Sequence, residues 1–276
     1  MTNEVSERRS FRRAAPKVSV VTVCLNDLKG LRRTVESVER QLEYYPSVEH
    51  VIVDGNSSDG TLEFLQSYSY RHSVSWSSEP DSGIFDAMNK GAARATGDIL
   101  VFMNSADTFT SDDDLSFVAQ QWQGGEWEWG YGSIRYKNAD GVVIRGESQM
   151  PFNARKLELG FQFVPHQSMY VSAQLFKEVG GYSSDFGHAG DQEFAIRANL
   201  HSSPASWVRY ISDFEIGGVH EDTTYLKREF LYRRMRAANN RFVAGSSTID
   251  FMVTSLIATL WTMRSIITRV AVPGRH

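Results

Sequence analysis

Cysteine is almost absent from this chain of 276 residues, in which Cys24 is the only one. A single cysteine cannot form a disulfide within the chain, and Cys-rich zinc sites are excluded for the same reason. A chain without disulfides fits a reducing compartment best, so we expect a cytoplasmic protein. Hydrophobic residues make up 41% and charged residues 22% of the sequence, which rules out a disordered or collagen-like chain.

Long hydrophobic runs are also missing. Residues 1–17 carry charge without an apolar stretch, so we predict no signal peptide there. Near the C-terminus, Phe251–Met263 holds 13 residues without a charge, fewer than the roughly 17–25 that span a bilayer. A helix in this region is predicted to lie on a membrane surface or to pack on a partner, and packing on its own domain is an equally open alternative.

The usual phosphate-binding loops are absent, because the sequence contains neither a Walker A motif nor G-x-G-x-x-G. A phosphate bound to this protein would therefore need a metal ion and loop amides to neutralise its charge. That requirement favours a nucleotide-diphosphate donor over ATP-driven motor chemistry. A nucleotidyltransferase is disfavoured as well, because the expected glycine-rich basic loop after the first strand is replaced by CLNDLKG.

Charge is distributed unevenly along the chain. Residues 1–17 hold five basic and two acidic residues, residues 18–226 hold 15 and 29, and residues 227–276 hold nine and two. The acidic body argues against a nucleic-acid footprint, whereas the basic ends suit an anionic membrane surface. The alternative is a solvated tail and an ordinary charged helix. We expect a disordered tail over 1–16, a catalytic domain over 17–225 and a helical extension over 226–276.

The first half of the chain alternates between apolar strand patterns and amphipathic helix patterns. This alternation predicts a doubly wound α/β unit with a mostly parallel sheet. The predicted strands are 18–25, 48–54, 74–76 and 98–103, and the predicted helices are 28–42, 61–70 and 84–95.

The pattern changes after about residue 115. Residues 127–137 and 142–147 flank a turn that contains Asp140-Gly141, which predicts a β-hairpin. No linker separates this half from the first, so we predict one α/β domain with a C-terminal helical extension. The remaining predicted elements are a strand at 167–171 and helices at 173–179, 191–200, 223–243 and 248–270.

Four loops that follow predicted strands carry acidic side chains. In an open α/β sheet, ligands bind outside the carboxyl ends of the strands, so these loops would converge. Carboxylate and amide oxygens at such an edge suit a hard cation such as Mg²⁺ or Mn²⁺, which commonly carries a diphosphate. The alternative for each aspartate alone is a helix N-cap. The loops are 22–27, 54–60, 79–83 and 104–107.

Six segments of the chain form a pattern that is informative as a set. They are VSVVTVCLN at 18–26, VEHVIVDGNSSDGT at 48–61, EPDSGIFDAMNKGAARATGDILVFMNSAD at 79–107, PHQSMYV at 165–171, GDQEFAIR at 190–197 and GGVH at 217–220. In this order the segments resemble family 2 glycosyltransferases with the GT-A fold. Of these, EPDSGIFDAMNKG is the most specific and is similar to bacterial enzymes that decorate cell-surface polysaccharides and glycolipids. The last ~45 residues lie outside the resemblance.

The resemblance implies a set of residues that bind the nucleotide sugar. Asp54 would accept a hydrogen bond from the base or ribose, and Asp81 would lie near the ribose or sugar. Lys90 or Arg94 would lie near the diphosphate. The implied set is Thr22, Asn26, Asp54, Asp81, Lys90, Arg94, Asn104, Ser105 and Asp107.

The metal motif departs from the family's Asp-x-Asp pattern. Here the segment is Asn104-Ser105-Ala106-Asp107, in which Asp107 is the remaining carboxylate. The resemblance implies that Asp107 binds Mn²⁺ or Mg²⁺ and that His220 completes the site. Since a lost carboxylate weakens binding of such cations, two alternatives stay open. Either the donor phosphates complete a weak site, or the chemistry is independent of metal.

Asp191 is implied as the general base, with Asp185 as a weaker alternative, whereas capping of a helix is the structural alternative for Asp191. His166 and Gln167 would contact the acceptor or the phosphate. The resemblance thus implies an inverting glycosyltransferase of hexosyltransferase type. Its donor would be a UDP, GDP or dTDP sugar, and its acceptor a hydroxyl of a glycolipid or polysaccharide. The competing hypothesis is a non-catalytic or metal-independent protein that binds nucleotide sugars.

Overall fold

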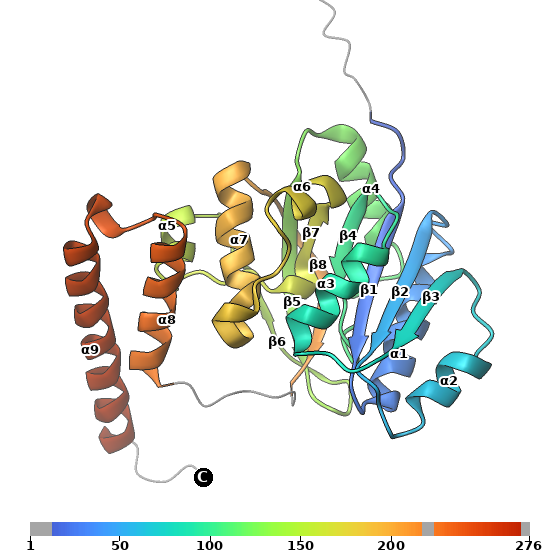
Figure 1. Cartoon of the computed structure of the whole chain (residues 1–276), viewed down its shortest axis with the longest axis horizontal. Helices are drawn as coiled ribbons and strands as arrows, with labels where there is room; N and C mark the ends of the chain where they lie inside the picture. Colours follow the sequence, from blue (N-terminus) through green and yellow to red (C-terminus); the bar gives the residue numbers. More distant parts are fainter. Residues whose placement is uncertain (1–12, 217–223, 272–276) are drawn as a thin grey trace, which may run out of the picture.

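A computed structural model describes residues 13–216 and 224–271, with side chains described up to residue 265. The strands form one eight-stranded sheet (Figure 1). They are β1 (Val18–Cys24), β2 (Val48–Asp54), β3 (Ser73–Ser78), β4 (Ile99–Phe102), β5 (Trp129–Lys137), β6 (Val143–Glu147), β7 (Met169–Ser172) and β8 (Ala205–Glu215).

Helices cover both faces of this sheet. The α-helices are α1 (Leu28–Gln41), α2 (Thr61–Ser67), α3 (Ile84–Arg94), α4 (Asp114–Gly124), α5 (Ala154–Glu158), α6 (Ala173–Glu178), α7 (Gly190–His201), α8 (Tyr225–Ala238) and α9 (Ser247–Ala271). Three short 3₁₀ turns, η1 (His166–Ser168), η2 (Ser184–Ala189) and η3 (Val243–Gly245), join some of them.

Strand direction determines which loops meet. The sheet order is β3-β2-β1-β4-β7-β5-β6, with β8 paired to β5. Strands β1 to β4 are mutually parallel, while β7 runs antiparallel to both β4 and β5. The carboxyl ends of β1 to β4 therefore share one edge with the beginning of β7. We call this edge the rim.

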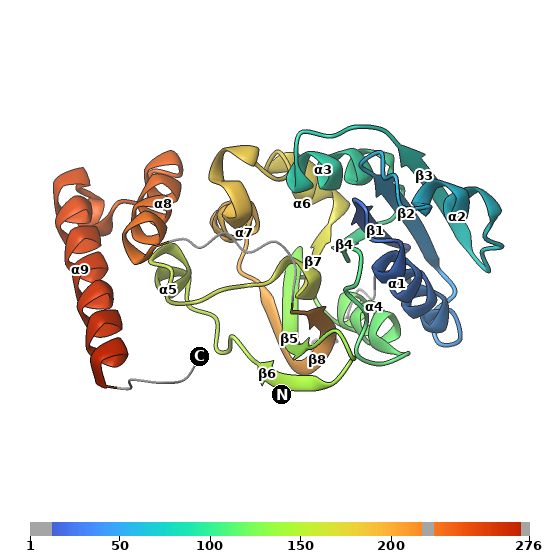
Figure 2. The ribbon, with the colours of Figure 1, turned by 90° about the horizontal axis from the view of Figure 1, so that it is seen from below.

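Two layers of helices enclose the sheet. One apolar cluster joins it to α3, α6 and α7, through residues such as Met88, Leu175 and Phe194. Two further clusters join the opposite face to α1, α2 and α4. Figure 2 shows these two groups of helices on opposite sides of the strands. The buried apolar run Val18–Cys24 needs this double cover because it has no solvent-facing side.

The C-terminal helices form an outer layer. Helix α8 lies between α7 and α9 in both views (Figures 1 and 2). Arg236 of α8 is almost fully buried; it pairs with Asp250 at 2.7 Å and donates to the Glu158 carbonyl and to Thr254. One guanidinium thus connects α5, α8 and α9, which fixes the extension to the domain.

The first-half strands and helices occur as predicted, in the predicted order, and the hairpin is present as antiparallel β5 and β6. Two differences concern the second half. Helices α4 and α5 and strand β8 were not predicted. In addition, the strand predicted at 167–171 begins as the turn η1 and becomes extended only at Met169.

Replacing Arg236 with alanine is expected to lower the free energy of unfolding by about 3–5 kcal/mol, because it leaves the buried Asp250 carboxylate without its main partner. Urea unfolding followed by circular dichroism measures the change. The control is Arg233→Ala, whose side chain is 24% exposed and lies 3.4 Å from the same carboxylate. Equal losses in the two variants would contradict the assigned role of Arg236.

Candidate functional site

The loops after β1 and β2 are tied together at the rim. Asn26 lies in the left-handed region, with φ of 53°, and its Oδ1 accepts from the Ser58 N–H at 2.9 Å. The Asn26 N–H donates to the Ser57 hydroxyl at 2.7 Å. Since the Asn26 side chain is exposed, it stays available to a ligand at this edge.

Asp54 organises the second loop from inside. Its carboxylate is fully buried and accepts from the N–H and hydroxyl of Ser57 and from the Ser78 hydroxyl at 2.6 Å. These bonds join the ends of β2 and β3. In this arrangement Asp54 shapes the loop that would contact a nucleotide.

Thr22 does not reach the rim surface. Its side chain has no exposed area, and its hydroxyl lies 2.8 Å from His50 Nε2. The expectation that Thr22 lines a nucleotide pocket is therefore corrected, because the side chain belongs to the interior under α1. Its position in β1 explains the error, since successive side chains of a strand point to opposite faces of the sheet.

Asp81 and Lys90 lie close to the rim. Asp81 accepts from the Gly83 N–H at 2.9 Å, and a Cβ on Gly55 would come within 2.7 Å of its Oδ2. The β2 and β3 loops therefore pack directly on each other. Lys90 Nζ lies 3.2 Å from Asp86 and donates to the Pro80 carbonyl at 3.1 Å. An ammonium group is thus held beside the β3 loop.

Arg94 lies away from this edge. It is the last residue of α3, which begins at the rim and runs back along the sheet, and its guanidinium donates to the Trp76 carbonyl at 3.2 Å. Eleven helical residues cover about 16 Å. The expectation that Arg94 approaches a diphosphate is corrected, because the helix carries it toward the opposite edge.

A second group of side chains gathers around His166. Its Nε2 lies 3.0 Å from Asn104 Nδ2 and 3.9 Å from Asp107 Oδ2, while its Nδ1 lies 3.7 Å from Asp191 Oδ2. These residues come from the β4 loop, the turn η1 and the first turn of α7. The structure thus brings together four residues from three segments that are far apart in the sequence, and we call Asn104, Asp107, His166 and Asp191 the His166 cluster.

The 104–107 turn directs Asp107 inward. Ala106 adopts φ of 74°, and the Asp107 N–H donates to the Asn104 carbonyl at 3.0 Å. Thr34 of α1 donates to the Asp107 carbonyl at 2.8 Å. Thr108 exchanges two backbone bonds with Asp213 of β8, which anchors the turn on its other side. Ser105 is half-buried within the same turn.

Burial changes the acidity of Asp107. Loss of solvation raises the pKa of its carboxyl to about 7, and the nearby His166 offsets part of that increase. A cation beside this group would favour its charged form. The ionised form of Asp107 is therefore destabilised unless a positive charge lies beside it.

These residues fit a divalent cation. Asn104 Oδ1 is buried and has no hydrogen-bond partner, so an amide oxygen is available beside the Asp107 carboxylate. Oxygen ligands of this kind suit Mg²⁺ or Mn²⁺. His220, the other expected ligand, lies outside the described residues.

Another group with metal-ligand chemistry lies elsewhere. His201 Nε2 is 3.7 Å from Glu128 and 3.4 Å from Glu178. These residues come from the start of β5 and the ends of α6 and α7, at the edge opposite the rim. The group is therefore separate from the His166 cluster.

Asp191 occupies the first turn of α7 and is 3% exposed. Its Oδ1 accepts from the Gln192 N–H at 2.8 Å, and the positive end of the helix dipole favours its negative charge. Burial raises the pKa of the phenols of Tyr182 and Tyr232. The negative charge of nearby Asp191 raises the pKa of both phenols further. Tyr232 belongs to α8, so the extension contributes to the wall of the site.

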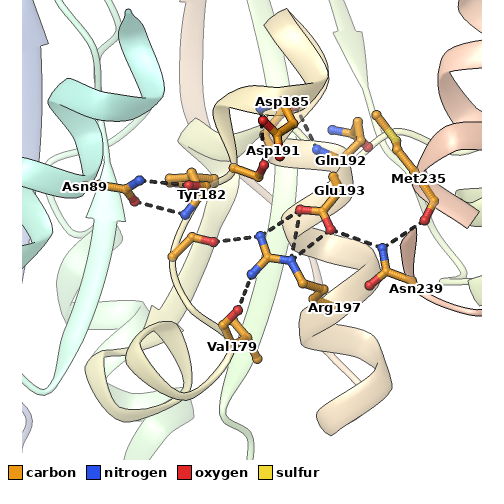
Figure 3. Close-up of polar contacts among 12 residues, drawn as sticks. Asn89, Val179, Tyr182, Asp185, Asp191, Gln192, Glu193, Arg197, Met235 and Asn239 are labelled. Carbon is orange, nitrogen blue, oxygen red and sulfur yellow. Dashed lines mark hydrogen bonds and ion pairs between the residues drawn. The ribbon is translucent and has the colours of Figure 1, made fainter. Parts of the chain in front are cut away.

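The neighbours of Asp191 are committed to other contacts. Figure 3 shows Glu193 turned toward Arg197 and Asn239, with which it forms an ion pair and a hydrogen bond, respectively.

Two other residues expected at the site lie outside the His166 cluster. Asp185 is exposed in η2. Gln167 is 4% exposed, so His166 is the member of that pair that lies within the cluster.

Sequence reasoning missed Tyr182 and Tyr232. Tyr232 lies in the segment without resemblance, and its approach to Asp191 depends on how α8 packs. One sequence signal was available: Gly160, with φ of 75°, leaves room for the Tyr232 ring, since a Cβ there would come within 2.7 Å.

Asp107→Asn is expected to stabilise the metal-free protein at pH 8, by up to about 4 kcal/mol. A carboxyl whose folded pKa is raised to about 7 favours folding at low pH, and this contribution is lost as pH rises through 7. The gain should shrink toward pH 4, because the folded wild-type carboxyl is then protonated and the unfolded one, with its ordinary pKa of 3.8, is about half protonated. Urea unfolding with chelator at pH 8, 6 and 4 measures it, and a difference independent of pH would contradict it.

Comparison with protein families matches residues 19–177 to the family described as Glycosyl transferase family 2. An uncharacterized glycosyltransferase of Mycobacterium tuberculosis is 38% identical over 242 residues, which cover 86% of this chain and 89% of the relative. A PGL/p-HBAD biosynthesis glycosyltransferase of Mycobacterium bovis is 30% identical over 229 residues, which cover 80% and 84%.

Solved structures share the fold. TarS of S. aureus in complex with UDP-GlcNAc has a TM-score of 0.65 at 17% identity and covers 85% of this chain and 69% of its own. The mannosyltransferase PcManGT from Pyrobaculum calidifontis, in complex with GDP-Man and Mn²⁺, has a TM-score of 0.63 at 15% identity and covers 95% and 77%. These likenesses confirm the GT-A type of α/β fold predicted from the sequence.

Proposed function

Because this chain belongs to glycosyl transferase family 2, we propose that it transfers a sugar from a nucleotide-diphosphate sugar to an acceptor hydroxyl, with inversion at the anomeric carbon. The observation that carries the proposal is the His166 cluster. It brings a candidate cation ligand, Asp107, and a candidate base, Asp191, to opposite sides of one imidazole.

The donor binds at the rim in this proposal. Asn26 and Asp81 contact the nucleoside and sugar, Lys90 lies near the diphosphate, and Asn104 and Ser105 flank it. Structures that share the fold and contain UDP-GlcNAc or GDP-Man support a donor of the UDP or GDP type, and a dTDP sugar is the third candidate. Asp54 supports this arrangement by holding the loop that follows β2.

Asp107 and the Asn104 amide oxygen would hold a divalent cation, Mn²⁺ or Mg²⁺. When bound, such a cation supplies positive charge that stabilises the leaving nucleoside diphosphate. The raised pKa of Asp107 and the unpartnered Asn104 Oδ1 support this assignment. His220 would supplement the ligand set.

Asp191 acts as the general base. It takes the proton of the acceptor hydroxyl while that oxygen forms a bond to the anomeric carbon. The bond between this carbon and the diphosphate oxygen breaks, and its electron pair leaves with the diphosphate. The Asp191 carboxylate is almost fully buried, which limits its contact with bulk water, and His166 Nδ1 lies 3.7 Å from it.

The acceptor in this proposal is a glycolipid or a cell-envelope polysaccharide, at the inner face of the cytoplasmic membrane. Its support is the relative named for PGL/p-HBAD biosynthesis and the basic extension of this chain. One observation favours a different function: Ala106 removes a carboxylate that the family usually has. A non-catalytic protein that binds nucleotide sugars would account for it, and such a protein would release no nucleotide from the donor.

Asp191→Asn is expected to lower the rate of nucleotide release in the transfer reaction by at least ~100-fold, because the amide cannot accept the proton. The measurement pairs initial rates with a thermal-shift titration that shows intact donor binding. Asp185→Asn is the matched control, since its carboxylate is exposed in η2. Transfer near the wild-type rate by the Asp191 variant would reject the base assignment.

UDP, GDP or dTDP is expected to raise the melting temperature more with Mn²⁺ or Mg²⁺ than with chelator. Ligand at ~100 times its dissociation constant adds about 2.7 kcal/mol of stability. Asp107→Asn should remove the metal-dependent part and leave the metal-independent part. Stabilisation that chelator does not change would be consistent with a transferase but would contradict the proposed cation site. If no nucleotide stabilised the protein, the non-catalytic function would be favoured.

A further inference from the structure

Helix α9 uses one face to pack against the protein. Thr254 and Ala258 are buried on that face, and Asp250 is fully buried in its pairing with Arg236. The rings of Phe230 and Phe251 are 5.8 Å apart where α8 meets α9. The contacts that hold the helix in place are therefore confined to its inner side.

The other side of α9 carries an apolar stripe, which consists of Ile249, Met252, Leu256, Leu260 and Met263. Met252, Leu256, Leu260 and Met263 are each 55–59% exposed. Their spacing of three or four residues places them on one side of the helix. Within the described part of the chain, α9 is the outermost element, with α8 beside it (Figures 1 and 2).

The charge around the stripe is basic. Asp250 is the carboxylate of α9, and it is buried away from solvent. On the side of α9 that faces α8, the Trp261 ring stacks on Tyr225, and the Arg228 and Arg264 guanidinium groups lie 5.6 Å and 5.4 Å from it. Residues 227–276 hold nine basic and two acidic residues, whereas residues 18–226 hold 15 and 29. The extension therefore complements an anionic surface, whereas residues 18–226 do not.

A second copy of the chain fits this stripe less well than a lipid surface does. A twofold pairing through α9 would bring two basic extensions together, and like charges repel. An anionic bilayer instead attracts the basic residues of the extension. Among the described residues, no helix has both the length and the hydropathy to cross a bilayer, which leaves an orientation parallel to the surface.

We propose that the outer face of α9 docks on the surface of an anionic lipid bilayer, with the apolar stripe inserted among the lipids and the basic residues at the headgroups. Arginine and lysine side chains suit that boundary, because each combines an apolar stem with a charged end. The acidic body is repelled from the same surface, so the protein binds in one orientation. The proposal deepens the proposed function, because it brings the enzyme to the plane of a lipid-linked acceptor.

The experiment is co-sedimentation of the full chain with phosphatidylcholine vesicles that contain or lack phosphatidylglycerol. The wild-type protein should sediment with the anionic vesicles and not with the neutral ones. Leu256→Glu combined with Leu260→Glu should lower the partition coefficient at least about tenfold, since it places two carboxylates in the inserted stripe. Val208→Glu is the matched control, because Val208 is 91% exposed on β8 and away from α9.

Thermal melting checks that the double variant folds, and release of nucleotide from the donor in detergent-free solution checks the active site. Retained nucleotide release with lost vesicle binding supports the docking surface. Unchanged vesicle binding by the folded double variant overturns the proposal. Wild-type protein that binds neutral and anionic vesicles equally, or that binds neither, overturns it as well. A wild-type dimer that the double variant converts to a monomer assigns the stripe to a second copy instead. Loss of nucleotide release with Asp191→Asn tests the proposed function separately.

Discussion

The antiparallel insertion of β7 beside β4 is the constraint on which the site depends. A strand that continued the parallel order would end at the rim, but β7 begins there. Its beginning delivers His166 next to Asn104 and Asp107. The chain then passes through α6 and η2 and returns Asp191 to the same place. One reversal of strand direction thus assembles side chains from three separate segments.

The assembled cluster is electrostatically costly without a ligand. Two carboxylates, each almost fully buried, share one imidazole, and the pKa of Asp107 is raised by its loss of solvation. Elsewhere the same protein pairs a buried charge directly, as with Arg236, whose guanidinium has carboxylate, carbonyl and hydroxyl partners. Arg236 and its partners thus hold the fold together, whereas the carboxylates of the His166 cluster are available to a bound molecule.

The sequence predicts most of the first half because its strands are buried runs such as Val18–Cys24, between amphipathic helices. Strand β8 is harder to predict, since exposed Val208 and Tyr210 interrupt its apolar pattern. Family motifs identify Asp107, His166 and Asp191 individually. They do not predict the distances between these residues, which depend on the direction of β7 and on the 3₁₀ turn η1. Thr22 and Arg94 are misplaced by motif reasoning because it does not record which side of a strand or which end of a helix a residue occupies.

Ala106 adopts a left-handed backbone conformation, at φ of 74°. Aspartate and asparagine tolerate that region better than alanine does, because their side chains can bond to the local backbone. The turn therefore retains a shape in which a second carboxylate is accommodated more easily than the methyl group now present. In the proposed function, one substitution at Ala106 would raise cation affinity at this rim, and the backbone conformation that suits the new carboxylate is already in place.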